Sequence, residues 1–119
     1  MTARLWTDLR APDFAGLDPM RTIAVLPTAA VEQHGPHLPL DVDQLLVTSV
    51  ALAAGEKLPE KILVLPCVSY GYTGHVMDFP GTINVHYQHF IESVIDICKS
   101  LAYHGFKKIA ILNGHGSNM

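Results

Sequence analysis

Apolar segments of two kinds alternate along the chain. Residues 21–27 (RTIAVLP), 61–68 (KILVLPCV) and 108–112 (KIAIL) are almost continuously apolar and rich in β-branched residues, as strands buried on both faces are. Residues 44–54 are apolar over most of a helical surface, and residues 86–104 place apolar side chains at three- and four-residue spacing. The alternation predicts an α/β fold, with a mainly parallel sheet between helices in three layers, α/β/α.

Polar and glycine residues mark where these elements begin and end. Asp41 or Asp43 can cap the first helix, and Gly55 and Gly105 stand where the two helices are expected to stop. Residues 69–81 form a loop dense in Gly, Tyr and Pro that continues into residues 82–85. This loop is too long to be only a turn.

Composition limits the classes of function. The chain has 119 residues, 49% of them hydrophobic, which fits a single α/β domain over residues 1–119. Its eight Lys and Arg are scattered and its net charge is −3, so no basic patch indicates nucleic acid or an anionic membrane surface. No apolar run approaches the roughly 20 residues that span a bilayer. We expect a cytoplasmic protein that acts on a small molecule, with Cys67 and Cys98 as reduced packing residues.

Histidines follow each of the three predicted strands. His34 and His37 come after the first, His75 after the second and His115 after the third. Because ligands bind beyond the carboxyl ends of parallel strands, these loops are expected to converge on one site. His86, His89 and His104 belong instead to the long helix or its ends, where we expect no metal role.

The first of these loops has the composition of a metal site. The run EQHGPHLPLDVD, from Glu32 to Asp43, holds two histidines and three carboxylates in twelve residues. Imidazole nitrogen and carboxylate oxygen together suit Zn, Mn, Fe or a related divalent ion. The prolines and Gly35 fix the backbone of the loop, which an ordinary polar linker would not need.

Three motifs, in order, resemble one family. EQHGPHLPLDVD, GYTGHVMDFPGTI and the final NGHGSN are similar to the motifs of the creatininase family of metal-dependent amidohydrolases, which includes formamide deformylases and a peptidase of redox-cofactor biosynthesis. The resemblance runs from about Trp6 to the last residue. It implies a two-metal centre, hydrolysis of a C–N amide bond in a cyclic amide, formamide or similar small substrate, and a homo-oligomer.

The resemblance also implies a ligand set. Glu32, His34 and Asp43 match the first motif, His115 matches the histidine of the last, and Asp43 resembles the carboxylate that bridges the two ions, which would be Zn, Mn or Fe. His75 is the candidate for substrate contact or proton transfer, with an equal alternative in which it only pins its loop. His37 is a candidate for orienting a ligand, and Tyr72 for lining the pocket.

Two departures from the family limit the analogy. Creatininase has a Glu ligand two positions after the NGH histidine, whereas this chain has Ser117, near which a phosphate or ribose group of a substrate could also bind. Family domains are about twice as long, so we expect an amino-terminal half whose sheet is incomplete at the C-terminus. The alternative function is therefore an inert half-domain that only binds metal or a partner chain.

Overall fold

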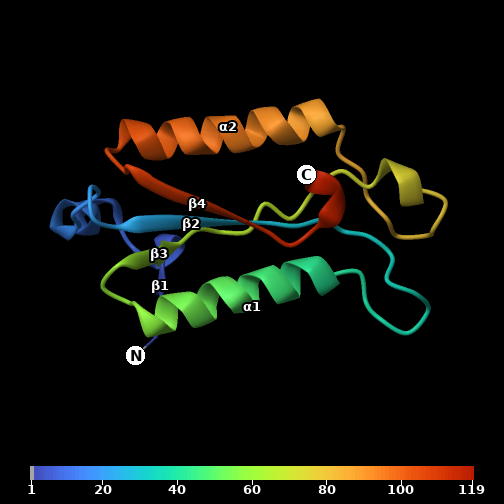
Figure 1. The fold of residues 1–119 in the computed structure, drawn as a ribbon, viewed down its shortest axis with the longest axis horizontal. Coiled ribbons are helices and arrows are strands. Elements are labelled where there is room, and N and C mark those ends of the chain that lie inside the picture. Colours follow the sequence, from blue (N-terminus) through green and yellow to red (C-terminus); the bar gives the residue numbers. More distant parts are fainter. Residues whose placement is uncertain (1) are drawn as a thin grey trace.

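A parallel sheet lies between two long helices in the computed structural model, which describes residues 2–119 (Figure 1). The strands lie in the order β1 (Arg4–Leu5), β3 (Ile62–Val64), β2 (Ile23–Thr28) and β4 (Lys108–Asn113). Helix α1 (Val42–Lys57) covers one face of the sheet and α2 (Tyr87–Tyr103) the other (Figure 1). Short 3-10 turns complete the chain, η1 (Trp6–Asp8), η2 (Ala11–Gly16), η3 (Gly74–Val76) and η4 (Gly116–Asn118). The predicted α/β class and its three layers are confirmed.

Strand β2 lies between β3 and β4 in the sheet and is almost entirely buried, which suits its nearly continuous apolar sequence. Its residues alternate between two cores: Ala24 and Leu26 pack on the α2 side, and Val25 packs on the α1 side. Its pairing with β4 runs from Ile23↔Lys108 to Thr28↔Asn113, in parallel. The loops that follow β2 and β4 therefore leave the sheet at the same edge, as the sequence predicts.

Beyond shifts of one to three residues at other element ends, the structure departs from the prediction at β1, β3 and the end of α1. Strand β1 was not predicted, because a two-residue strand shows no periodicity. Strand β3 ends at Val64, and beyond Pro66 only an isolated bridge from Val68 to Thr28 continues it. The prediction that the first helix stops at Gly55 is wrong, since α1 continues to Lys57. Gly55 is instead buried where the helix meets Ala3, whose Cβ would lie 2.9 Å from an added side chain.

The surface of the described chain contains apolar side chains on both helices. Leu45, Leu46 and Val50 of α1 are exposed, as are Ile95 of α2 and Ile111 of β4, which line the same shallow hollow. Within residues 2–119, β4 pairs only with β2 and forms one edge of the sheet. No described helix is both long and apolar enough to cross a membrane.

Both cysteines have free thiols and are half-buried. Burial raises the pKa of the Cys67 thiol, and hydrogen bonds from its neighbours Ser69 and Thr48 only partly oppose that effect. A raised pKa lowers the fraction of reactive thiolate near neutral pH. This supports a packing role for Cys67.

Candidate metal centre

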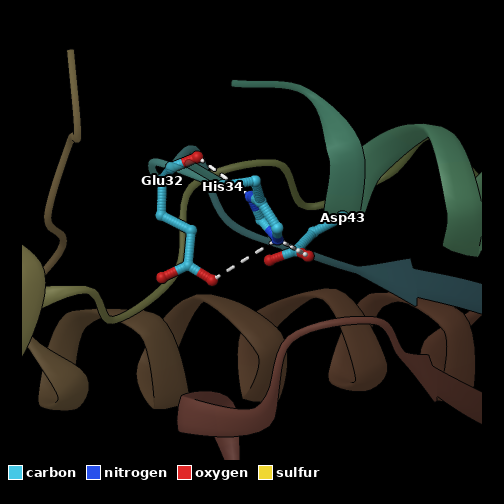
Figure 2. A group of neighbouring side chains, drawn as sticks. All are labelled: Glu32, His34 and Asp43. Atoms are coloured by element: carbon cyan, nitrogen blue, oxygen red, sulfur yellow. Dashed lines mark hydrogen bonds and ion pairs between the residues drawn. The ribbon is translucent and has the colours of Figure 1, made fainter. Parts of the chain in front are cut away.

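Three side chains from the first motif point toward one another at the carboxyl edge of the sheet (Figure 2). Glu32 and His34 lie in the loop after β2, and Asp43 lies in the first turn of α1. One potential ligand atom from each of the three lies within 4.8 Å of the others. His34 Nε2 is 3.2 Å from Asp43 Oδ1 and 3.9 Å from Glu32 Oε1. The motif thus folds back on itself, which brings Asp43 to Glu32 and His34.

The loop after β4 brings His115 to the same carboxylates. Its Nδ1 lies 2.8 Å from Asp43 Oδ2 and 3.1 Å from Glu32 Oε1. The side chains of His115 and Asp43 are only 3% and 9% exposed, so this part of the cluster is largely shielded from water. The four residues that the sequence singled out as ligands therefore lie together, although they come from three separate segments.

Backbone pairing holds the Glu32 segment in place. Ile83 donates its N–H to the Val31 carbonyl at 3.0 Å, which forms an antiparallel bridge just before Glu32. The next contact is the Gln33 N–H donating to Thr82 Oγ1 at 3.2 Å. The long loop that contains residues 82 and 83 thus supports the first motif directly, which gives that loop a structural function.

His34 and His115 each donate one ring N–H to a backbone carbonyl. His34 Nδ1 is 3.2 Å from the Glu32 carbonyl oxygen, and His115 Nε2 is 2.8 Å from that of Tyr72. A carbonyl can only accept, so these nitrogens carry the protons. In neutral rings the remaining nitrogens, His34 Nε2 and His115 Nδ1, present lone pairs to the carboxylates. Metal-binding histidines are oriented in this way by the partner of their other nitrogen.

The donor set fits divalent cations. With neutral rings, two carboxylates and two nitrogen lone pairs face one another in a largely buried cluster, an arrangement that a bound cation would stabilise. Asp43 Oδ2 is buried and accepts no hydrogen bond, even though His115 Nδ1 is close. The two oxygens of Asp43 face different histidines, as a carboxylate shared between two ions would. Mixed imidazole and carboxylate donors suit zinc, manganese or iron.

A polar network that the sequence did not reveal fixes the backbone of His115. Asn113 Oδ1 accepts from the His115 N–H at 3.3 Å and from Thr28 Oγ1 at 3.0 Å, while its Nδ2 donates to the His115 carbonyl at 2.7 Å. Asn113 was visible only as part of NGHGSN. The register of β4 against β2 places it beside Thr28, and a single sequence does not disclose that register.

The other predicted site residues lie in different surroundings. His75 is exposed on η3, with Nε2 3.4 Å from Ser117 Oγ, so the structure brings these two together. The Tyr72 ring centroid is 6.2 Å from that of His75. His37 is exposed, and among the described residues no hydrogen bond or ion pair joins it to the carboxylates. The roles of these four residues stay predictions.

The histidines of the long helix lie at its ends or on its exposed surface. His86 is the residue before α2, and its Nδ1 accepts from the Gln88 N–H at 3.3 Å. His89 is exposed on the first turn, and His104 follows the last turn. The placement of these histidines on or beside the helix is confirmed.

Comparison with known proteins identifies the family of this site. The family described as "Creatininase: Creatinine amidohydrolase" matches residues 7–119. The creatinine amidohydrolase of Pseudomonas putida is 37% identical over 101 residues, which cover 81% of this chain and 38% of that protein. The mycofactocin precursor peptide peptidase of Mycobacterium tuberculosis (strain ATCC 25618 / H37Rv) is 35% identical over 103 residues, covering 80% and 41%.

The fold leads to the same result. A solved structure described as "Creatininase Mn" superposes with a TM-score of 0.89 and 32% sequence identity, covering 98% of this chain and 47% of that one. The chain spans less than half the length of each of these three proteins. Since the family match extends over nearly all of the sequence and the backbone follows the same path, the chain belongs to the creatininase family.

Proposed function

We propose that this chain provides the ligand-bearing part of a metal-dependent amidohydrolase that cleaves a C–N amide bond in a small substrate. One observation carries the proposal: both histidines fix one ring nitrogen on a backbone carbonyl and turn the other toward Glu32 and Asp43. The relatives named above, a creatinine amidohydrolase and a peptide peptidase, support hydrolysis of an amide. The substrate class is a cyclic amide, a formamide or a similar small amide.

The candidate ligands form two groups, one around each carboxylate oxygen of Asp43. Asp43 Oδ2, His115 and Glu32 would hold one ion, and Asp43 Oδ1 with His34 would hold a second. When bound, the two ions would supply Lewis acidity for the amide carbonyl and lower the pKa of the attacking water. The second group has fewer ligands, because Ser117 stands where creatininase has a Glu. A further carboxylate is expected from outside the described residues.

A proton must reach the leaving nitrogen as the C–N bond breaks. We assign this role, or contact with the substrate, to His75, which is exposed and 3.4 Å from Ser117 Oγ. Ser117 and the Tyr72 side chain are assigned to the substrate side of the site. His37 is assigned the role of orienting a metal ligand from outside the ligand set.

The test is metal content, measured by elemental analysis on protein purified without chelators or affinity metals. We expect close to two divalent ions per chain, and loss of both in Asp43→Ala, since Asp43 faces both histidines. Asp41→Ala is the matched control. Asp41 lies two residues earlier, is exposed, and makes no side-chain cap on α1, so its loss should leave metal content unchanged.

Metal-loaded protein is then assayed on small amides and formamides. Turnover that is lost in Asp43→Ala but retained in Asp41→Ala would support the amidohydrolase. Metal binding with no hydrolysis of any amide, even in a longer protein that contains this chain, would favour the inert metal-binding alternative. Absence of metal from the wild-type protein would contradict the proposed centre itself.

A further inference from the structure

The Tyr72 carbonyl, which orients His115, belongs to a peptide whose N–H is also hydrogen-bonded. The Tyr72–Thr73 peptide accepts from His115 Nε2 through the Tyr72 oxygen, at 2.8 Å. The N–H of the same peptide, on Thr73, donates to Asn84 Oδ1, also at 2.8 Å. The peptide is planar, so its carbonyl and its N–H cannot turn independently. The hydrogen bond to Asn84 therefore also fixes the direction of the carbonyl that accepts from His115 Nε2.

The preceding peptide is fixed by a second asparagine. The Tyr72 N–H donates to Asn118 Oδ1 at 3.1 Å, while Asn118 Nδ2 donates to the Ala29 carbonyl at 3.0 Å, just beyond β2. Gly71 makes this approach possible. A Cβ there would lie 2.4 Å from the Ala29 oxygen and 2.5 Å from Asn118 Oδ1, which leaves no room for a side chain.

The peptides on both sides of Tyr72 are thus held by asparagine side chains that come from different parts of the chain. Thr73, which follows, is fully buried, and its Oγ1 donates to the Ile83 carbonyl at 2.8 Å. This arrangement leaves the Tyr72 carbonyl one direction, toward His115. The carbonyl that orients His34 is held in a similar way, because the N–H of the same peptide, on Gln33, donates to Thr82 Oγ1 at 3.2 Å.

We propose that Asn84 and Asn118 are positioning residues of the metal centre, which keep the Tyr72 carbonyl hydrogen-bonded to His115 Nε2. The inference rests on the proposed function, because His115 Nδ1 is the atom offered to the ion. If the carbonyl turns away, the His115 ring is free to rotate or to carry its proton on Nδ1, and either change removes a lone pair from the carboxylates.

The experiment uses the 119-residue chain with Asn84→Ala, Asn84→Asp, Asn118→Ala and wild type. Zinc affinity is measured by competition with a chelating dye, and the His115 Nε2–H proton is followed by NMR in metal-free protein. We expect about a tenfold loss of zinc affinity in Asn84→Ala, at the lower end of the effect of residues that support a ligand. The Nε2–H signal should broaden through faster exchange with water.

Asn84→Asp distinguishes positioning from general loosening. Asn84 uses only its oxygen in this contact, and a carboxylate keeps that acceptor, so both the affinity and the protected Nε2–H signal should return toward wild type. Asn118→Ala should behave like Asn84→Ala and serves as a second variant if that one folds poorly. Gln88→Ala, which removes an exposed amide on the first turn of α2, should change neither readout.

Two results would overturn the proposal. One is wild-type affinity and an unchanged Nε2–H signal in both alanine variants. The other is an equal loss of affinity in Asn84→Ala and Asn84→Asp while the Nε2–H proton stays protected, which would mean that the loop is merely loosened. A wild-type protein that binds no zinc would contradict the proposed function, whereas Nε2–H exchange in metal-free protein would still decide this inference.

Discussion

Gly114 sets how closely His115 approaches Asp43. A Cβ at Gly114 would lie 2.7 Å from the Val47 Cβ and 3.1 Å from the Asp43 carbonyl oxygen. Both of those atoms belong to α1, so a side chain would force the loop after β4 away from the helix. The glycine of the NGH motif is therefore required by close packing between the segments that contain Asp43 and His115.

Gly114→Ala is expected to lower the free energy of unfolding by about 1–3 kcal/mol, the range for an overpacked core position. It should also weaken metal binding, because His115 moves with the loop. Urea unfolding and dye competition measure the two effects. Gly116→Ala is the control, since nothing lies within 4 Å of a Cβ at that position and both quantities should stay near wild type. Equal behaviour of the two variants would refute the packing argument.

At this scale the sequence was informative about side chains and uninformative about the backbone. Glu32, His34, Asp43 and His115 were named in advance, and the structure brings them together. Three of the four lie in one short motif, so little of the fold is needed to assemble them. The Tyr72 carbonyl could not have been named, because every residue has a carbonyl and only the tertiary structure selects one of them.

Helix α1 carries Asp43 into the site, so its distance from the sheet matters. Ala51 lies on the inner face of α1, is fully buried, and packs with Val25, Ile62 and Val64. Because interiors are closely packed, a larger side chain at this contact would have to displace its neighbours. The helix reaches the sheet closely enough to place its first turn at the carboxyl edge.

Ala51→Leu should push α1 outward, destabilise the chain by about 1–3 kcal/mol and reduce metal content, although the change is two helical turns from Asp43. Ala53→Leu introduces the same side chain on the exposed face and should be tolerated. Thermal unfolding and elemental analysis of the two variants provide the comparison. Full metal retention in a destabilised Ala51→Leu protein would show that helix position and site geometry are independent.

Apolar periodicity located the elements but not all of their limits. Strands β2 and β4 were found because they are long apolar runs, whereas the two residues of β1 offer no pattern to detect. Gly55 looked like a helix stop, but tertiary contact with Ala3 explains it instead. In both cases the deciding interaction is with a segment distant in sequence, and local propensity carries no record of it.

For the whole molecule, the distribution of exposed apolar side chains predicts self-association. Leu45, Leu46 and Val50 are exposed on α1. Ile95 and Ile111 are exposed together on the α2 side of the sheet, at β4, which pairs only with β2 among residues 2–119. Contiguous apolar surfaces and open strand edges are the features through which chains associate. The homo-oligomer that the family resemblance implies also stays a prediction.

Sedimentation velocity over a range of protein concentrations should reveal species larger than a monomer. Ile95→Lys combined with Ile111→Lys should shift the distribution toward the monomer, because each places a charge on the apolar surface beside β4. Ser100→Lys, on an exposed position of the same helix, is the control for added charge. A monomeric wild-type chain at all concentrations would contradict the prediction.

The pairing of β2 with β4 has a consequence for how the protein is made. Thr28 and Asn113, which pair at the end of these strands, are 85 residues apart in sequence, and His115 lies just beyond. A ribosome therefore releases Glu32, His34 and Asp43 long before it synthesises His115, the fourth candidate ligand. Closing so long a loop is entropically costly and comes late in folding. Assembly of the proposed four-ligand centre is thus tied to the pairing of β4 with β2.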